Sequence, residues 1–311
     1  MEGALEANGG HGQPPAWSVW WQLARPFSLT ASALPVLVGS AVAFYGGRLT
    51  SPDLFLAMLL ASLLIQAATN MFNEYYDYRQ GLDTPESVGI AGSIVRGHVQ
   101  PIAVFVGAIA CFCGALVLGL YIVLRTEPVV LVAGVVSALA GYLYTGGPIP
   151  IAYTPLGEVT VFLFMGPVIV GLAYFIQAGS VSSSAIWASI PIGCLVAAIL
   201  LANNLRDVVA DAHIGRRTVV VVLGRPTALG MYILLLAGAF VSTILAVLIG
   251  ALPVTALLPI LTVRTPLRLV RLYRSTLEPR PLNAGVRGSA GLHARYGLLL
   301  ALGIALGTLI R

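Results

Sequence analysis

Long apolar runs separated by short polar segments dominate the chain. A helix that crosses a bilayer needs about 20 predominantly apolar residues. Nine apolar stretches lie at about 28–45, 53–72, 102–124, 128–145, 158–177, 186–203, 227–249, 251–263 and 291–310. The pattern predicts an all-α, polytopic membrane helix bundle of about nine transmembrane helices. Residues 1–16 are polar and rich in Gly and Pro, which predicts a disordered tail ahead of one membrane domain over 17–311.

Composition supports this picture and excludes several classes of protein. Apolar residues make up 58% of the chain and charged residues only 9%, whereas a soluble domain carries about 25% charged residues. A soluble enzyme, a nucleic-acid-binding protein and a disordered chain are therefore excluded. All 17 basic residues are Arg, so there is no lysine for a Schiff base or a phosphate-binding loop. Cys111, Cys113 and Cys194 lie in apolar runs and are interpreted as buried thiols.

The arginines are shared unequally between the two ends of the predicted helices. The segments 73–101 and 204–226 and the stretch after 263 hold most of them, and the loops at the opposite end hold only Arg48 and Arg125. The positive-inside rule places the arginine-rich side in the cytoplasm. We therefore expect a multi-pass protein of the plasma (inner) membrane, with a cytoplasmic N-terminus and an external C-terminus. The first apolar run is expected to act as an uncleaved signal-anchor.

Two acidic clusters follow the second and sixth apolar runs. In the first, Asn70, Asn73, Glu74 and Asp77 share one helical face, because they are spaced i, i+3, i+4 and i+7. Gly81 is expected to end that helix, and Asp83 follows it.

The second cluster repeats part of this spacing. Asn203, Asp207 and Asp211 recur every four residues, and Asn-x-x-x-Asp occurs at 73/77 and at 203/207. The two clusters lie four predicted helices apart, which indicates a parallel internal repeat with a site at its interface.

Carboxylates at a membrane boundary are costly and usually functional. Crowded carboxylates repel one another unless a cation lies between them. These clusters offer only hard oxygen ligands, which suit Mg²⁺ held by carboxylates together with phosphates. Nearby arginines can hold phosphate oxygens in bidentate fashion. The pattern therefore predicts a cradle for a metal-bound diphosphate, against the plainer alternative of helix capping and solvated charge at the membrane edge.

Several segments resemble the UbiA superfamily of intramembrane prenyltransferases, and more narrowly its 1,4-dihydroxy-2-naphthoate prenyltransferases of menaquinone biosynthesis. They are Asn73-Glu-Tyr-Tyr-Asp77 through Gly81-Leu-Asp83-Thr84, Ser87 to Arg96, Tyr144-Thr-Gly-Gly-Pro to Tyr153 with Leu156-Gly-Glu158, and Leu201 to Asp207 through Gly215-Arg-Arg-Thr218, with Arg25-Pro26 opening the first span. The resemblance implies nine helices around a central cavity, capped by cytoplasmic loops.

The resemblance also implies an activity. That activity is Mg²⁺-dependent transfer of a polyprenyl group from its diphosphate to an aromatic acceptor, with Mn²⁺ as the alternative ion. In the naphthoate subfamily CO₂ and diphosphate are released and demethylmenaquinone is formed. The implied partners are the polyprenyl diphosphate, the aromatic acceptor and membrane lipids.

Carried over position by position, the resemblance implies three sets of site residues. The metal ligands would be Asn73, Glu74, Asp77, Asp83, Asn203, Asp207 and Asp211. The substrate-binding residues would be Arg25, Asn70, Arg96, Arg206, Arg216 and Arg217. The catalytic residues would be Asp77, Asp207, Asp211 and Tyr144, whose ring face can stabilise an allylic cation. Glu74 stands where the family usually has Asp, which weakens its assignment as a ligand.

Alternative interpretations stay open at this point. Acidic clusters in membrane helices also build proton or cation pathways, although such carboxylates usually lie near the midplane. The same chemistry with another quinone head group, chlorophyllide or glycerol phosphate as acceptor is a second alternative. Outside the acidic clusters, Arg264, Arg268, Arg271 and Arg274 share one helical face and are expected to bind anionic lipid headgroups. Trp17, Trp20 and Trp21 are expected to anchor the chain at the interface.

Overall fold

The computed structural model describes residues 14–49, 51–84 and 92–310, and these contain helices but no strand. The α-helices are α1 (Ala16–Ala24), α2 (Pro26–Tyr45), α3 (Pro52–Arg79), α4 (Pro101–Arg125), α5 (Val129–Thr145), α6 (Gly157–Leu163), α7 (Ile169–Ala178), α8 (Ser183–His213), α9 (Val219–Leu223), α10 (Arg225–Leu248), α11 (Arg264–Ser275) and α12 (Pro279–Leu306). The prediction of an all-α bundle is confirmed.

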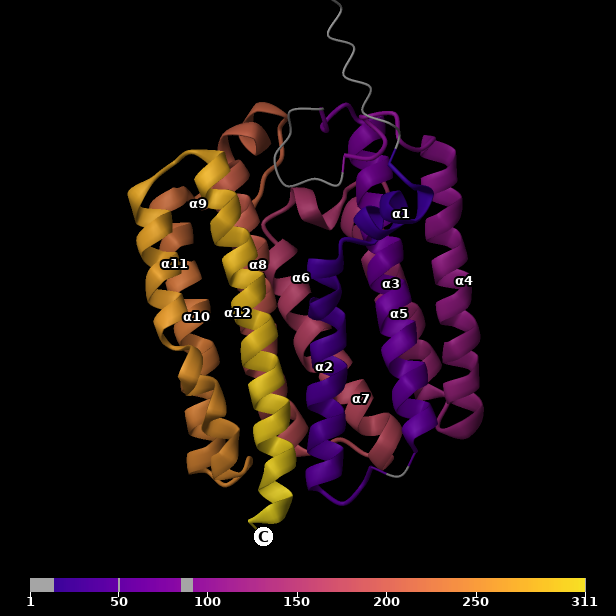
Figure 1. Ribbon diagram of the computed structural model, residues 1–311, viewed down its shortest axis with the longest axis vertical. Helices are drawn as coiled ribbons and strands as arrows, with labels where there is room; N and C mark the ends of the chain where they lie inside the picture. The colour runs from indigo at the N-terminus through magenta and orange to yellow at the C-terminus, as the bar shows by residue number, and fades with distance from the viewer. Residues whose placement is uncertain (1–13, 50, 85–91, 311) are drawn as a thin grey trace, which may run out of the picture.

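The long helices run side by side along one axis, as Figure 1 shows. Seven of the described helical segments are long and apolar enough to cross a membrane. One of them is Gly157–Ala178, in which the π-helical turn Phe164–Val168 joins α6 to α7 around Pro167. The apolar helix α5 has 17 residues. A multi-pass membrane protein is therefore established, while the count of nine crossings stays a prediction.

The prediction differs from the structure most at the last two spans. The predicted run 251–263 is a 3-10 helix over Val254–Thr262, and α11 continues it to Ser275. The last span was predicted to begin at residue 291, but α12 begins at Pro279. Hydrophobic runs underestimate both elements because the arginine-rich parts are helical too.

One thiol prediction is also wrong. Cys194 is buried and Cys111 half-buried, but Cys113 on α4 is exposed. An apolar run in a bilayer need not be covered by protein, since lipid is as apolar as the side chains it meets.

Helices α2, α8, α10 and α12 form the main packed core, together with α7 and α11. Close backbone approach makes this possible: a Cβ atom at Gly303 of α12 would clash with the backbone of Thr255. Small residues let membrane helices approach in this way. Arg225 at the start of α10 adds a polar tie, because it donates to the carbonyls of Leu205, Tyr273 and Thr276 at 2.7–3.0 Å.

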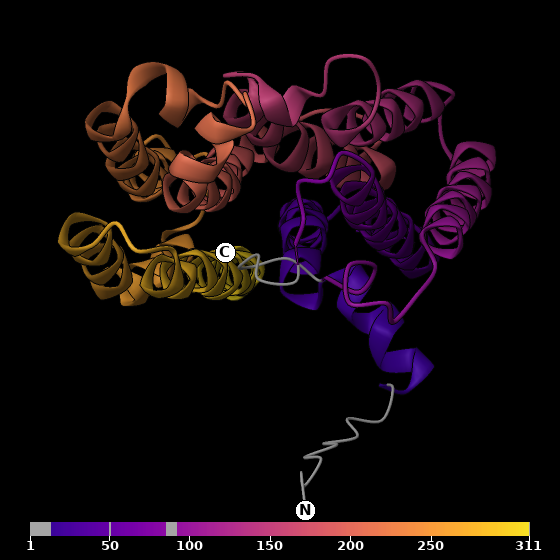
Figure 2. The ribbon, with the colours of Figure 1, turned by 90° about the horizontal axis from the view of Figure 1, so that it is seen from above.

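Helices α3 and α8 extend past their apolar runs, so both acidic clusters are helical. The predicted runs ended at 72 and 203, whereas α3 ends at Arg79 and α8 at His213. Gly81 has a φ of 68°, a left-handed conformation that Gly adopts readily, and the helix ends before it as predicted. Figure 1 shows α1 near the end of the bundle opposite the C-terminus. In Figure 2 the helices are seen end-on from the α1 side.

Candidate functional site

The ends of α3 and α8 are joined by one arginine. Arg216, in the segment after α8, donates to Asp77 Oδ1 of α3 at 2.7 Å and lies 3.5 Å from Asp211 Oδ1 of α8. Asp77 and Asp211 are both buried, with 7% and 3% of their surfaces exposed. One guanidinium therefore neutralises carboxylates from both sequence clusters, and the two clusters meet as predicted.

Tyr153 holds this arginine from the other side. The Arg216 guanidinium lies over the Tyr153 ring, 4.3 Å from its centroid. The Tyr153 hydroxyl lies 3.2 Å from Asp77 Oδ1 and 2.5 Å from Gln80 Oε1, and its backbone carbonyl accepts from the amide of Arg217. Burial, followed by the charge of Asp77, raises the pKa of the Tyr153 hydroxyl. Tyr153 and Gln80 were not among the predicted site residues, although Tyr153 ends one of the segments that carry the family resemblance.

Asp83 shows how crowded the negative charge is. Its pKa is raised to about 7, first by burial and then by the charges of Asp77 and Glu74, against the opposing effect of Arg25 and Arg216. A carboxyl in such surroundings gains from any cation placed beside it. Asp83, in the loop after α3, therefore lies within electrostatic reach of Asp77, Glu74, Arg25 and Arg216.

Arg25 contributes unsatisfied donors to the same region. It links α1 to α2 with a φ of 50°, and among the described residues it is the one non-Gly residue with a positive φ. Such a conformation is costly for a residue with a Cβ and is often found at functional sites. Its Nη2 lies 3.7 Å from Glu74 Oε2, and its Nε and Nη2 are buried without a hydrogen-bond partner. These donors suit an anionic group that is not part of the described protein.

One predicted metal ligand, Glu74, and one predicted substrate-binding residue, Asn70, already make structural hydrogen bonds. Glu74 is 1% exposed and accepts hydrogen bonds from the amides of Gly92 and Ile94 at 3.2 and 3.3 Å. The Asn70 side-chain amide donates to the Ala24 carbonyl and to Ser28 Oγ, both at 2.8 Å. Glu74 therefore fixes the chain after the first cluster, and Asn70 fixes the junction beside Arg25.

The second cluster has its own arginine. Arg206 donates to both carboxylate oxygens of Asp207 and, at 2.8 Å, to Asn283 of α12. One turn earlier, Asn204 donates to Glu158 of α6 at 2.8 Å, and the second oxygen of Glu158 is buried without a partner. Asn204, Glu158 and Asn283 were not among the predicted site residues, since their role depends on contacts between distant helices.

The remaining predicted residues lie around this group. Asn73 and Asn203 are half-buried on the faces that carry Asp77 and Asp207. A Cβ at Gly157 would lie 3.9 Å from the Tyr144 hydroxyl, which places Tyr144 beside the start of α6. A Cβ at Gly92 would meet the Arg96 guanidinium. Arg217 is exposed. The part of the predicted segment 87–96 before residue 92 lies outside the described residues.

The donor set fits a hard divalent cation. The side chains that converge are carboxylates and amides, which are ligands that Mg²⁺ prefers. In the described parts of the chain, no three His, Cys, Asp or Glu side chains are close enough to hold an ion already. Arg216 pairs with Asp77 and Asp211, and Arg206 with Asp207; these are carboxylates that a cation could bridge.

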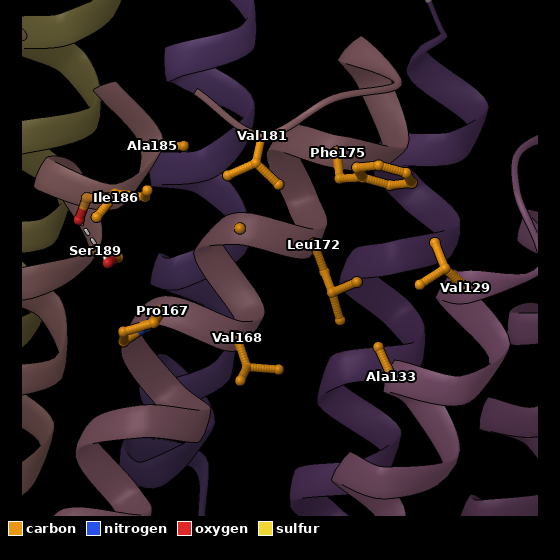
Figure 3. Close-up of a pocket in the computed structure, with 11 residues that line it drawn as sticks. Val129, Ala133, Pro167, Val168, Leu172, Phe175, Val181, Ala185, Ile186 and Ser189 are labelled. Carbon is orange, nitrogen blue, oxygen red and sulfur yellow. Dashed lines mark hydrogen bonds between the residues drawn. The ribbon is translucent and has the colours of Figure 1, made fainter. Parts of the chain in front are cut away.

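A separate apolar pocket lies at the opposite end of the helices. Figure 3 shows side chains of α5, α7 and the start of α8 around it, among them Val129, Leu172 and Ile186. Its volume is about 340 Å³, and the Ser189 hydroxyl in its wall already donates to the Ile186 carbonyl. Ser189 and Asp207 are about 27 Å apart along α8. The pocket therefore has no part in the polar site.

Comparison with known proteins identifies the family of the chain. The model of the UbiA prenyltransferase family matches residues 32–287. The chain is 40% identical over 286 residues to 1,4-dihydroxy-2-naphthoate octaprenyltransferase of Bacillus subtilis (strain 168), covering 92% of each chain. It is 32% identical over 291 residues to UbiA prenyltransferase domain-containing protein 1 of Gallus gallus, covering 91% of this chain and 83% of that protein.

A solved structure shares the fold. The UbiA homologue of Archaeoglobus fulgidus bound to GPP and Mg²⁺ has a TM-score of 0.60 at 18% identity, over 91% of this chain and 99% of that one. Since the family model matches most of the chain and the relatives are similar over nearly its whole length, this chain belongs to the UbiA prenyltransferase family.

Proposed function

We propose that this protein transfers a polyprenyl group from a polyprenyl diphosphate to 1,4-dihydroxy-2-naphthoate, with release of diphosphate and CO₂. The observation that carries the proposal is the convergence of Asp77 and Asp211 on Arg216, in a chain that is 40% identical to an enzyme named for this acceptor. A cation pathway would not explain the unpartnered arginine donors beside the carboxylates.

The charges of the site suit a diphosphate together with a divalent cation. When bound, Mg²⁺ (or Mn²⁺) would neutralise charge on the leaving diphosphate. The cation would be held by the carboxylates of Asp77, Asp83, Asp207 and Asp211, with Asn73 and Asn203 as neutral ligands. Glu74 would contribute indirectly, by fixing the backbone at Gly92 and Ile94. Arg206 and Arg216 would turn from the carboxylates to the diphosphate oxygens, and Arg96 and Arg217 would bind the same oxygens.

Arg25 and Tyr144 have proposed roles on the acceptor side. The buried Nε and Nη2 of Arg25 can donate to the naphthoate carboxylate or to the diphosphate, and Asn70 holds the junction that positions it. Tyr144 would present its ring face to the allylic cation. Catalysis then depends on groups placed in advance at the position where charge develops.

The reaction balances without an added oxidant or base. The bond between C1 of the prenyl group and the diphosphate oxygen breaks, and its electron pair leaves with diphosphate. The electron-rich ring carbon that bears the carboxylate forms a bond to C1. The ring–carboxylate bond then breaks, CO₂ leaves, and the electron pair of that bond restores the aromatic ring. The product of this site is the prenylated hydroquinone, and its conversion to demethylmenaquinone is a separate two-electron oxidation outside this reaction.

We also propose that residues 17–311 form one domain of the plasma (inner) membrane, with the motif loops and the N-terminus in the cytoplasm. The arginine-rich ends of the helices support this orientation, because Arg25 at the end of α1 lies 3.7 Å from Glu74 of α3, and Arg216 pairs with Asp77 one turn further along α3. Figure 1 shows α1 near the end of the bundle opposite the C-terminus.

The acceptor is tested directly by product analysis. Purified protein is given Mg²⁺, geranyl diphosphate and, in parallel, dihydroxynaphthoate, 4-hydroxybenzoate, chlorophyllide and glycerol phosphate, with products read by mass spectrometry. We expect prenylated product only with the naphthoate, accompanied by CO₂ and abolished by EDTA because the ligands are hard oxygens. A product from another acceptor alone, or full turnover with metal absence verified, would contradict the proposal.

The two aspartate clusters are tested by charge-removing substitutions. Asp77→Asn and Asp207→Asn keep the side-chain shape, and each should lower kcat about 10²–10³-fold with a smaller change in KM, since leaving-group charge develops only in the transition state. The double variant should lose much less than the product of the two losses, because both residues serve one site.

Asp53→Asn is the matched control for these variants. Asp53 lies on the same helix α3 at its other end, paired with Arg125 at 3.0 Å, and its substitution should leave kcat unchanged. Folded Asp77→Asn and Asp207→Asn proteins that turn over at the parent rate would show that the site is wrongly assigned.

The orientation is tested with topology reporters. A reporter fused after Arg311 should be active only outside the cytoplasm, and one inserted in the 79–98 segment only inside it. The reason is the asymmetry of arginines between the two ends. Two reporters on the same side would overturn the proposed orientation.

A further inference from the structure

The arginines of α11 form a column on the outer side of the bundle. Arg264, Arg268 and Arg271 are spaced four and three residues apart, so they share one face of the helix. All three are exposed, whereas Leu269 and Tyr273 on the opposite face are buried. Arg274, also exposed, continues the column by one further turn.

The register of α11 against α12 places Arg264, the first arginine of this column, well away from the α1 end of the bundle. The two helices are antiparallel, because a Cβ at Gly285 of α12 would meet the Tyr273 ring and one at Gly303 would meet Thr255. Arg264 lies midway between Tyr273 and Thr255 along the chain. It is therefore level with the middle of α12.

The neighbouring helix α10 shows what surrounds this level. The Tyr273 ring contacts the Tyr232 ring of α10, with centroids 5.2 Å apart. Arg264 lies about 13 Å further from the α1 end than Tyr273 along α11. At that depth α10 exposes Val241, which is 52% exposed. Arg264 is thus level with an exposed apolar side chain of a helix that is long and apolar enough to cross a membrane.

The column has no carboxylate partner among the described residues. Among the described residues, the ion pairs involve Arg25, Arg125, Arg206 and Arg216, and none involves an arginine of α11. Unpaired charges at hydrocarbon depth are costly and generally face a polar partner. Arginine side chains are long enough to reach along the helix toward the membrane surface, so an anion at that surface can approach this face.

We propose that the α11 arginine column binds the headgroup phosphates of an anionic phospholipid. The column extends over about 15 Å from Arg264 to Arg274, which is longer than one diphosphate. It faces outward, on the side of α11 opposite the packed core. A second copy of this chain would bring like charges together, so self-association does not fit the face. The proposal is independent of the prenyl-transfer reaction.

Native mass spectrometry of the full-length protein in detergent tests the proposal. The protein is titrated with phosphatidylglycerol and, separately, with phosphatidylcholine of the same acyl chains. We expect about a tenfold or larger preference for phosphatidylglycerol, because each arginine near an anionic headgroup contributes to attraction. The Arg264→Gln, Arg268→Gln, Arg271→Gln triple variant should lose that preference.

Two controls separate the column from general charge and from misfolding. Arg48→Gln, an exposed site at the other end of the bundle, should keep the parent preference. The triple variant with Lys at the same three positions keeps the positive charge and should retain most of the preference for phosphatidylglycerol. If the triple Gln variant does not fold, the parent, the single Arg268→Gln variant and the triple Lys variant still decide the question.

Three results would overturn the proposal. The first is equal binding of the two lipids by the parent protein, or an unchanged preference in the triple Gln variant. The second is displacement of phosphatidylglycerol by geranyl diphosphate in equal stoichiometry, which would make the column a substrate site. The third is a dimer that the triple Gln variant abolishes. None of these results depends on turnover.

Discussion

Mutual repulsion among buried carboxylates is the constraint that the site depends on. Asp77 and Asp211 come from helices separated by more than a hundred residues, yet both are nearly inaccessible to water. Such groups are tolerated only when a positive charge lies between them. Arg216 supplies that charge, and the Tyr153 ring and hydroxyl hold the guanidinium in place. The site is thus assembled around a cation that belongs to the protein itself.

This arrangement explains why helices α3 and α8 are so long. Both continue for two or more turns beyond their apolar runs, which carries their aspartates to the end of the bundle where α1 lies. The two helices belong to different packed clusters, α8 to the main core and α3 to two smaller ones, and Arg216 joins their ends. Arg225 ties the ends of α8 and α11 to α10 through three backbone carbonyls. The packed helices therefore fix the positions of the charged side chains at their ends, as a preorganised electrostatic site requires.

Local patterns in the sequence predict much of this structure. Apolar runs locate the spans, and the i, i+4 spacing of Asn73 and Asp77 predicts their shared face because both depend on helical periodicity alone. The extent of α11 and the early start of α12 were missed, since arginine-rich helices look polar. The contacts of Tyr153 and the hydrogen bonds of Glu74 to Gly92 and Ile94 link residues far apart in the chain. The left-handed backbone of Arg25 likewise depends on tertiary packing, which no local pattern encodes.

In the proposed reaction, Arg216 releases Asp77 and Asp211 to a divalent cation and turns to the oxygens of the diphosphate that arrives with it. Isothermal titration of Mn²⁺ into the purified protein, with and without the unreactive geranyl thiodiphosphate, tests it most directly. The account predicts at least about tenfold tighter Mn²⁺ binding with the analogue, because the arginine can then turn to the phosphate oxygens. It also predicts that Arg216→Gln strengthens Mn²⁺ binding without the analogue, since the carboxylates lose their competing partner. Mn²⁺ affinity that is independent of the analogue, or weakened by Arg216→Gln in its absence, would contradict the account.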